Sequence, residues 1–161
     1  DRNCYSMGRR SVMASDNIGY FGPHESTIRP GGHWGGCTAG KFTIGLASDG
    51  LVKGCASLPT GEFDADNVRD RPLSDIVRDH PAIRDLPTRT VDDLWGHCRT
   101  CYYAPVCLGG CTWTGHVTLG RAGNMPYCHH RALELQDQGL RERLQPTADG
   151  WALIEEPIPA S

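Results

Sequence analysis

The chain has 161 residues and a formal net charge of −3, with 16 basic side chains against 19 acidic ones. The arginines are scattered rather than gathered in a run or along one helical face, which argues against a nucleic-acid partner. No apolar segment approaches the roughly 18 to 20 residues needed to cross a bilayer, and the N-terminus lacks a basic stretch followed by an apolar region, so we expect neither membrane insertion nor a retained signal peptide.

This length is most simply one domain, large enough for a single core. Hydrophobic residues make up 39% of the chain, while 20 glycines and 11 prolines predict many turns and loops. We therefore expect something besides apolar burial to help hold the fold together. The chain opens on Asp1 rather than Met, so we expect either an excised fragment of a longer protein or a product trimmed at its start.

Residues 1–34 show no sustained periodicity and carry glycine and proline throughout. They predict an irregular lead-in, or a linker from an upstream domain, with one short strand at most.

A β-hairpin is predicted over residues 41–55, "KFTIGLASDGLVKGC". Apolar side chains alternate at Phe42, Ile44 and Leu46. Asp49-Gly50 is a two-residue turn signal, after which the chain returns.

This pairing would place Cys55 near Ile44. Cys37 could approach them only if the chain folds back at the glycines around it. Those glycines are Gly35, Gly36 and Gly40. Glycine permits such a bend because it has no Cβ.

From Pro72 onward the apolar spacing predicts a helix that is broken or restarted at Pro81. Thr90, with Asp93 three residues later, predicts a short capped turn that leads the chain directly into a cysteine cluster, whose thiols we place on loops. After Cys128, residues 129–144 predict an amphipathic helix. Its apolar positions are Leu133, Leu140 and Leu144.

The stretch "CRTCYYAPVCLGGC" holds four of the eight cysteines. A disulfide framework fits the even number, but secretion signals are missing and such short steps are poor disulfide geometry. Zinc favours two paired-cysteine knuckles, and this chain has one CxxC. A 4Fe–4S cluster suits uneven spacings drawn from loops and a distant fourth thiolate.

The whole cysteine pattern resembles the SPASM domain, the auxiliary-cluster region of many radical SAM enzymes. That pattern has a Cys, then a Gly followed by four residues and a second Cys, then CxxC, five residues, Cys, three residues, Cys, and a final distant Cys. The matching positions here are Cys37, Gly50, Cys55, Cys98, Cys101, Cys107, Cys111 and Cys128. The resemblance covers about residues 35–130.

The resemblance implies two 4Fe–4S clusters. Its second auxiliary cluster would be held by Cys98, Cys101, Cys107 and Cys128. The first auxiliary cluster would be held by Cys37, Cys55 and Cys111. The fourth ligand of that cluster stays open, and the candidates are a substrate atom and Cys4, which lies outside the pattern.

The fold we expect is α+β: a small loop-rich domain, over residues 35–130, with a β-hairpin and short helices organised around the two clusters. Residues 131–161 would form a C-terminal helix and tail. Because much of the order would come from the clusters, the apo form should be poorly folded.

The resemblance further implies a function as the accessory domain of, or partner to, a radical SAM oxidoreductase or maturase that modifies a peptide or protein in the cytoplasm. The auxiliary clusters would serve electron transfer or substrate binding. Radical SAM chemistry needs a CxxxCxxC motif, which this chain lacks, so we expect it not to be catalytic alone. S-adenosylmethionine would bind only through a radical SAM domain in cis or in trans.

Two other functions stay open: an independent iron–sulfur electron-transfer module, and a structural zinc domain that binds a peptide. Near the first cluster, His33 and Trp34 are candidates to line a substrate surface, although a Trp between glycines commonly covers a core instead. His97, His129 and His130 flank cysteines and could bind a cluster or tune it. Aromatic side chains around the cysteine loop would exclude water. They are Trp95, Tyr102, Tyr103 and Trp113.

Overall fold

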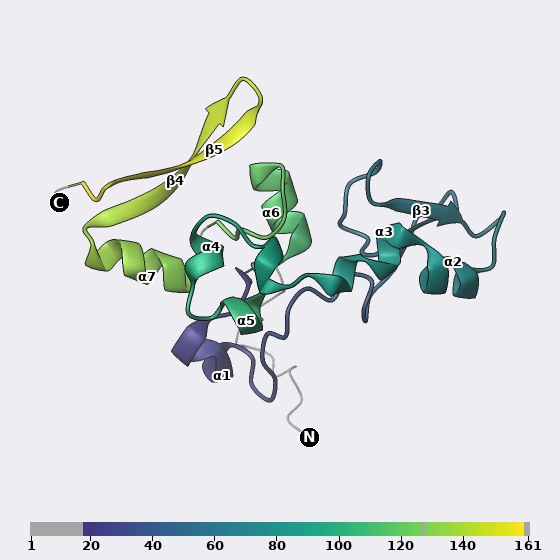
Figure 1. The fold of residues 1–161 in the computed structure, drawn as a ribbon, viewed down its shortest axis with the longest axis horizontal. Helices are drawn as coiled ribbons and strands as arrows, with labels where there is room; N and C mark the ends of the chain where they lie inside the picture. The colour runs from purple at the N-terminus through teal and green to yellow at the C-terminus, as the bar shows by residue number, and fades with distance from the viewer. Residues whose placement is uncertain (1–17, 127, 160–161) are drawn as a thin grey trace, which may run out of the picture.

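The structure is a computed structural model that describes residues 18–126 and 128–159, so Cys4 lies outside the described residues. The described part has mixed α+β architecture, which confirms the predicted class (Figure 1). Its helices are α1 Glu25–Ile28, α2 Leu73–Asp79, α3 Pro81–Arg84, α4 His97–Thr100, α5 Ala104–Cys107, α6 Thr112–Leu119 and α7 His129–Asp137. Single 3₁₀ turns are η2 Gly22–His24, η3 Leu86–Thr88 and η4 Val91–Asp93. Its strands are β1 Gly45–Leu46, β2 Leu51–Lys53, β3 Asp64–Asn67, β4 Leu140–Thr147 and β5 Gly150–Pro157.

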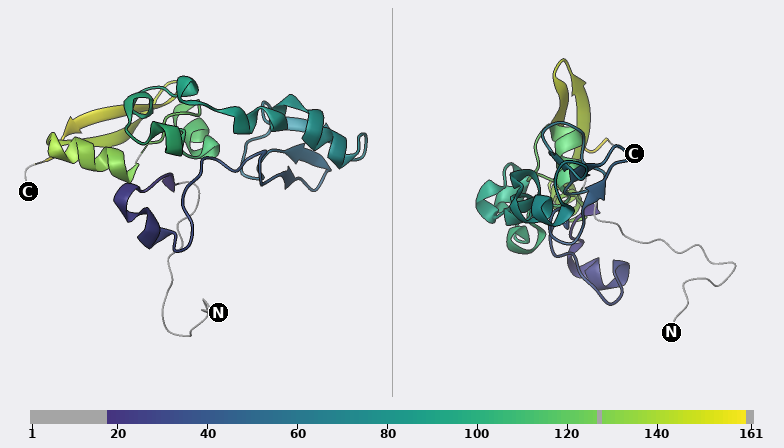
Figure 2. Two further views of the ribbon diagram at one scale, coloured as in Figure 1. Left: turned by 60° about the horizontal axis from the view of Figure 1, so that its bottom comes forward. Right: turned by 90° about the vertical axis from the view of Figure 1, so that its right-hand side faces the viewer.

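These elements form an elongated molecule with two ends and a middle (Figures 1 and 2). Strands β1, β2 and β3 make an antiparallel sheet in that order, and α2 and α3 lie with it at one end. Helices α4, α5 and α6 occupy the middle, and α7 with the β4–β5 hairpin forms the other end. None of the helices formed by the described residues is long and apolar enough to span a bilayer.

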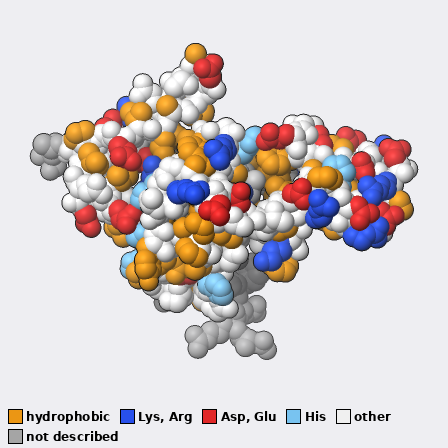
Figure 3. Space-filling view, viewed as in Figure 1, with side chains coloured by type: hydrophobic (Ala, Val, Ile, Leu, Met, Phe, Trp, Pro, Cys, Tyr) orange, Lys and Arg blue, Asp and Glu red, His pale blue; other side chains and the backbone are white. Residues whose placement is uncertain are grey.

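Two small hydrophobic cores correspond to this division. At the sheet end, Val52, Ile76 and Ile83 are fully buried together. In the middle, the core includes the thiol of Cys98. Its other buried members are Leu94, Ala104 and Met125. Charged side chains crowd the sheet end, whereas hydrophobic side chains gather over the middle of the same face (Figure 3).

The predicted hairpin exists as β1 and β2, but the two-residue turn is wrong. The turn spans residues 47–50, with the N–H of Gly50 donating to the carbonyl of Ala47. Leu46 therefore pairs with Val52, and the expected register shifts by one residue. A shift of one exchanges the faces of a strand. Gly45 is accordingly buried, while Phe42 is 79% exposed.

The chain folds back after Cys37, which the glycines around it permit. The carbonyl of Thr38 accepts hydrogen bonds from the N–H groups of residues 41–43, which closes a tight reversal. Gly40 stands in it at φ 71° and donates to Gly54, the residue before Cys55. A Cβ on Gly40 would lie 2.3 Å from the carbonyl oxygen of Ile83, so this approach requires glycine.

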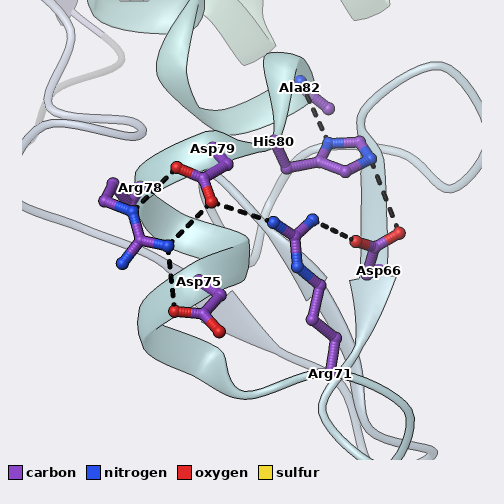
Figure 4. Close-up of polar contacts among 7 residues, drawn as sticks. All are labelled: Asp66, Arg71, Asp75, Arg78, Asp79, His80 and Ala82. Carbon is purple, nitrogen blue, oxygen red and sulfur yellow. Dashed lines mark hydrogen bonds and ion pairs between the residues drawn. The ribbon is translucent and has the colours of Figure 1, made fainter.

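The helix after Pro72 breaks at Pro81 as predicted. His80 between α2 and α3 is extended, and its ring Nδ1 accepts from Ala82 N–H at 3.2 Å. Figure 4 shows that Arg71 bridges Asp66 of β3, at 2.8 Å, to Asp79 of α2, at 3.0 Å. These ion pairs fasten α2 to the sheet.

The capping of the turn at residues 90–93 is also confirmed. Thr90 N–H donates to the Asp93 carboxylate at 2.7 Å, and the two side chains contact each other. The turn delivers the chain to α4.

Two expectations about the chain ends are corrected. The amphipathic helix predicted for residues 129–144 stops at Asp137, because Gly139 at φ 72° redirects the backbone. Residues 140–157 then form an antiparallel hairpin in place of helix and tail. In the described part of the lead-in, η2 and α1 replace the short strand that we allowed for.

Candidate functional site

Four cysteines separated along the sequence line one cavity in the middle of the molecule. They are Cys98, Cys101, Cys107 and Cys128. The cavity itself has a volume of about 20 Å³, and the atom-free space reaches about 320 Å³ when the solvent-open mouth is included. Its remaining walls come from Tyr20, Tyr103, Ala104, Gly109, Met125 and His130. We call it the four-cysteine site.

The cysteines of this site lie in or next to short helices, which corrects the expectation of loops for Cys98 and Cys107. Cys98 lies within α4, and Cys101 is the residue that ends it. Cys107 is the last residue of α5, and Cys128 is the residue before the first turn of α7. Because three separate helices contribute, the packing of the middle core sets the positions of the thiols.

Backbone N–H groups point at the sulfurs. Met125 N–H donates to Cys98 Sγ at 3.3 Å, and Tyr103 N–H donates to Cys101 Sγ at 3.4 Å. Further backbone donors reach the other two sulfurs: Tyr20, Gly109 and Gly110 for Cys107, and His130 and Arg131 for Cys128. Such donors stabilise negative charge on sulfur and tune a bound metal centre.

Burial dominates the proton affinity of these thiols. It raises the pKa of Cys98 to about 11, and it raises the pKa values of the other three above their ordinary value as well. A thiolate in an apolar enclosure is costly unless positive charge compensates it. The site therefore favours either four thiols or four thiolates around a cationic centre.

A run of left-handed backbone turns the chain between Cys107 and Cys111. Leu108 has φ 52°, and Gly109 and Gly110 both have φ 71°. A Cβ on Gly109 would lie 2.8 Å from the backbone of Gly123. This close approach lets the 107–111 segment lie directly against the loop that leads to Cys128.

Cys111 turns away from the four-cysteine site and meets Cys37 instead. A thiol-to-thiol hydrogen bond from Cys111 lowers the pKa of Cys37 to about 5, and the same contact raises the pKa of Cys111. Cys55 follows β2 and is half-buried. Among the contacts of described residues, none joins the Cys55 thiol to either of them. The structure thus brings two of the three expected first-cluster ligands together.

Trp34 is buried, at 3% exposed, and does not face solvent. Its indole Nε1–H donates to the Cys107 carbonyl at 3.0 Å, so the side chain packs beneath the four-cysteine site. His33 beside it is exposed. A buried Trp34 fits the role of covering the core better than the role of lining a substrate surface.

The histidines next to the cysteines pack on their neighbours. The Nε2 atoms of His97 and His130 lie 3.1 Å and 3.4 Å from the Glu134 carboxylate. His129 stacks on Phe21 at 4.3 Å between ring centroids. No group of three or more His, Cys, Asp or Glu side chains in residues 18–126 and 128–159 is gathered tightly enough to hold a single metal ion.

Three charged side chains that the sequence reasoning missed hold this region in place. Arg89 donates to the carbonyls of Leu108 and Gly110 at 3.1 Å and 3.3 Å. Buried Glu25 accepts the Trp34 N–H at 2.6 Å. Buried Arg131 contacts Asn124 at 3.0 Å. A charged residue in a sequence is usually exposed. Nothing in the local pattern distinguishes these three.

No protein-family model matches the chain, and a search of curated proteins returns no significant match.

Proposed function

We propose that this chain is an auxiliary 4Fe–4S cluster-binding domain of, or partner to, a radical SAM enzyme that modifies a peptide or protein. One observation carries the proposal. Four cysteines from α4, α5 and the start of α7 converge on one cavity, in the grouping that the family resemblance assigns to the second auxiliary cluster.

The residues present fit such a group. The donor set is four thiols, which are the usual ligands of a 4Fe–4S cluster. The walls are largely apolar, and backbone N–H groups already point at the sulfurs. All seven described cysteines are free, as metal ligation requires.

Each part of the site then has a role. Cys98, Cys101, Cys107 and Cys128 hold one cluster, and Cys37, Cys55 and Cys111 hold another. Tyr20, Tyr103 and Met125 would keep water from the four-cysteine site. When bound, such clusters supply one-electron redox chemistry.

We propose that electron transfer, substrate binding or both are the contribution of this domain. S-adenosylmethionine would be bound by a separate radical SAM domain, in cis or in trans, and the peptide or protein substrate would lie between the two. A reducing compartment such as the cytoplasm would keep these thiols available.

Paired substitutions test the ligand assignment. In the full chain, reconstituted without oxygen, Cys98→Ser should lose about half of the bound iron, and Cys111→Ser should lose about the other half. Cys4→Ala tests the open fourth ligand, since unchanged iron and unchanged cluster spectra would exclude Cys4. The assignment fails if Cys98→Ser leaves the iron content at the parent level.

A further test separates the enzyme-associated function from an independent electron-transfer module. If the full-length gene product extends upstream into a CxxxCxxC domain, the auxiliary function holds. If the chain is complete in itself and reduces or oxidises a carrier protein without such a partner, the independent module is correct.

A further inference from the structure

Cys37 and Cys111 form a thiol pair that is separate from the four-cysteine site. Their sulfurs contact each other as hydrogen-bond partners. Both side chains are half-buried rather than sealed in the core. Two thiols in hydrogen-bond contact have their sulfur atoms near enough to each other for disulfide formation to be tested directly.

A small hollow has Cys37, and not Cys111, among its described lining residues. Its described lining residues are Gly35, Gly36, Cys37, Lys41, Leu86, Pro87, Arg89 and Leu108. Lys41 and Gly35 are exposed, so the hollow is open to solvent. The charged side chains among these lining residues are both basic. A small anionic molecule is therefore attracted to the Cys37 sulfur.

We propose that, when no cluster is bound, Cys37 and Cys111 act as a thiol–disulfide exchange site that takes an anionic low-molecular-mass disulfide such as oxidised glutathione. The order of steps follows from access. Cys37 lines the hollow and reacts first. Its hydrogen-bond partner Cys111 then resolves the mixed disulfide.

The chemistry balances in two steps. The Cys37 thiolate attacks one sulfur of the small disulfide, forming a mixed disulfide and releasing one glutathione thiolate. The Cys111 thiolate then attacks Cys37 Sγ, which forms the Cys37–Cys111 disulfide and releases the second glutathione. The two protein thiols lose two electrons and two protons, and the small disulfide gains them.

This reaction would close the first cluster site while it leaves the four-cysteine site open. An oxidised chain should then accept about four irons on reconstitution instead of about eight. The exchange itself does not depend on the proposed function, because it requires only the two thiols and the hollow.

The test treats the full chain, purified without cluster reconstitution, with oxidised glutathione and maps the disulfides by mass spectrometry. We expect a Cys37–Cys111 disulfide as the main product. Cys111→Ser should instead accumulate a glutathione adduct on Cys37, and Cys37→Ser should give no adduct on Cys111. Disulfides scattered over all cysteines, or formed first within the four-cysteine site, would overturn the proposal.

A charge variant tests the hollow. Lys41→Gln should slow the reaction with oxidised glutathione about threefold to tenfold, and it should leave the rate with the neutral 2-hydroxyethyl disulfide unchanged. Equal slowing with both disulfides would refute the recognition of anions. Iron and sulfide content, measured on a separate reconstituted sample, reports on the proposed function alone.

Discussion

Replacing Arg131 with Leu should detach the C-terminal hairpin from the rest of the molecule. Arg131 lies on α7 and forms an ion pair with Glu142 of β4, and both side chains are only 5% exposed. Removing one partner of a buried pair leaves an uncompensated charge, at a cost of about 3 to 5 kcal/mol. The lost hydrogen bond to Asn124, 3.0 Å long, adds about 1 kcal/mol.

Native-state hydrogen exchange is the suitable assay, because it reports local opening. Each 1.4 kcal/mol corresponds to a tenfold change in an equilibrium constant, so amides of β4 and β5 should exchange at least about a hundredfold faster in Arg131→Leu. Arg141→Leu is the matched control. Its ion pair with Glu156 is half-exposed, and such pairs contribute about 1 kcal/mol or less.

The double variant Arg131→Leu, Glu142→Leu completes the argument. Because it removes the Glu142 carboxylate together with Arg131, it should recover much of the lost protection. If Arg131→Leu speeds amide exchange less than about fivefold, the buried pair does not hold the hairpin. The same conclusion follows if adding Glu142→Leu speeds exchange again by a similar factor.

Three further outcomes follow from single contacts. Gly109→Ala and Gly120→Ala both place a side chain in the left-handed backbone region, at a cost of about 1 to 2 kcal/mol. Of the two, only the Gly109 variant would place its Cβ 2.8 Å from backbone atoms, those of Gly123. Iron binding after reconstitution should therefore fall in Gly109→Ala and not in Gly120→Ala. Burial raises the pKa of Glu25, yet hydrogen bonds from two backbone N–H groups and Arg29 outweigh it and hold the pKa below 4.5. The denaturation midpoint should therefore exceed that of Glu25→Gln at neutral pH, and the difference should vanish as the pH falls below about 4.5; a gap independent of pH would contradict this. Trp34→Phe removes one of the two donors to the Cys107 carbonyl and leaves the Gly110 N–H, so it should lower the free energy of unfolding by about 1 kcal/mol, whereas an unchanged melting temperature would show that the bond contributes nothing.

Much of the local structure could be predicted from short-range chemistry. Pro81 ends a helix because its ring excludes a continued hydrogen-bond ladder, and Thr90 with Asp93 caps a turn through contacts three residues apart. The fold-back at Gly40 followed from the freedom of glycine at positive φ. Such features need no knowledge of distant residues.

The C-terminal hairpin shows where this reasoning fails. The apolar spacing of Leu133, Leu140 and Leu144 fits a helix, whereas the strand pattern is hidden because its buried position between two leucines is Glu142. That carboxylate can be buried because it forms an ion pair with Arg131 of α7. A pattern based on hydrophobicity cannot detect a buried ion pair.

The candidate site divides in the same way. The family resemblance grouped Cys98, Cys101, Cys107 and Cys128, and the structure places all four around one cavity. The sequence did not predict where the Cys55 thiol lies. Its position depends on the register of β1 and β2, which differs by one residue from the expected register. The sequence also gave no sign that Tyr20 of the lead-in would form part of the cavity wall.

The most direct test of the account is the content of iron, acid-labile sulfide and zinc per chain after anaerobic purification and cluster reconstitution, with EPR spectra of the reduced sample. Two 4Fe–4S clusters require about eight irons and eight sulfides per chain, with signals typical of reduced clusters. Stoichiometric zinc without sulfide would contradict the account, and it would make the chain a structural zinc module without a redox role.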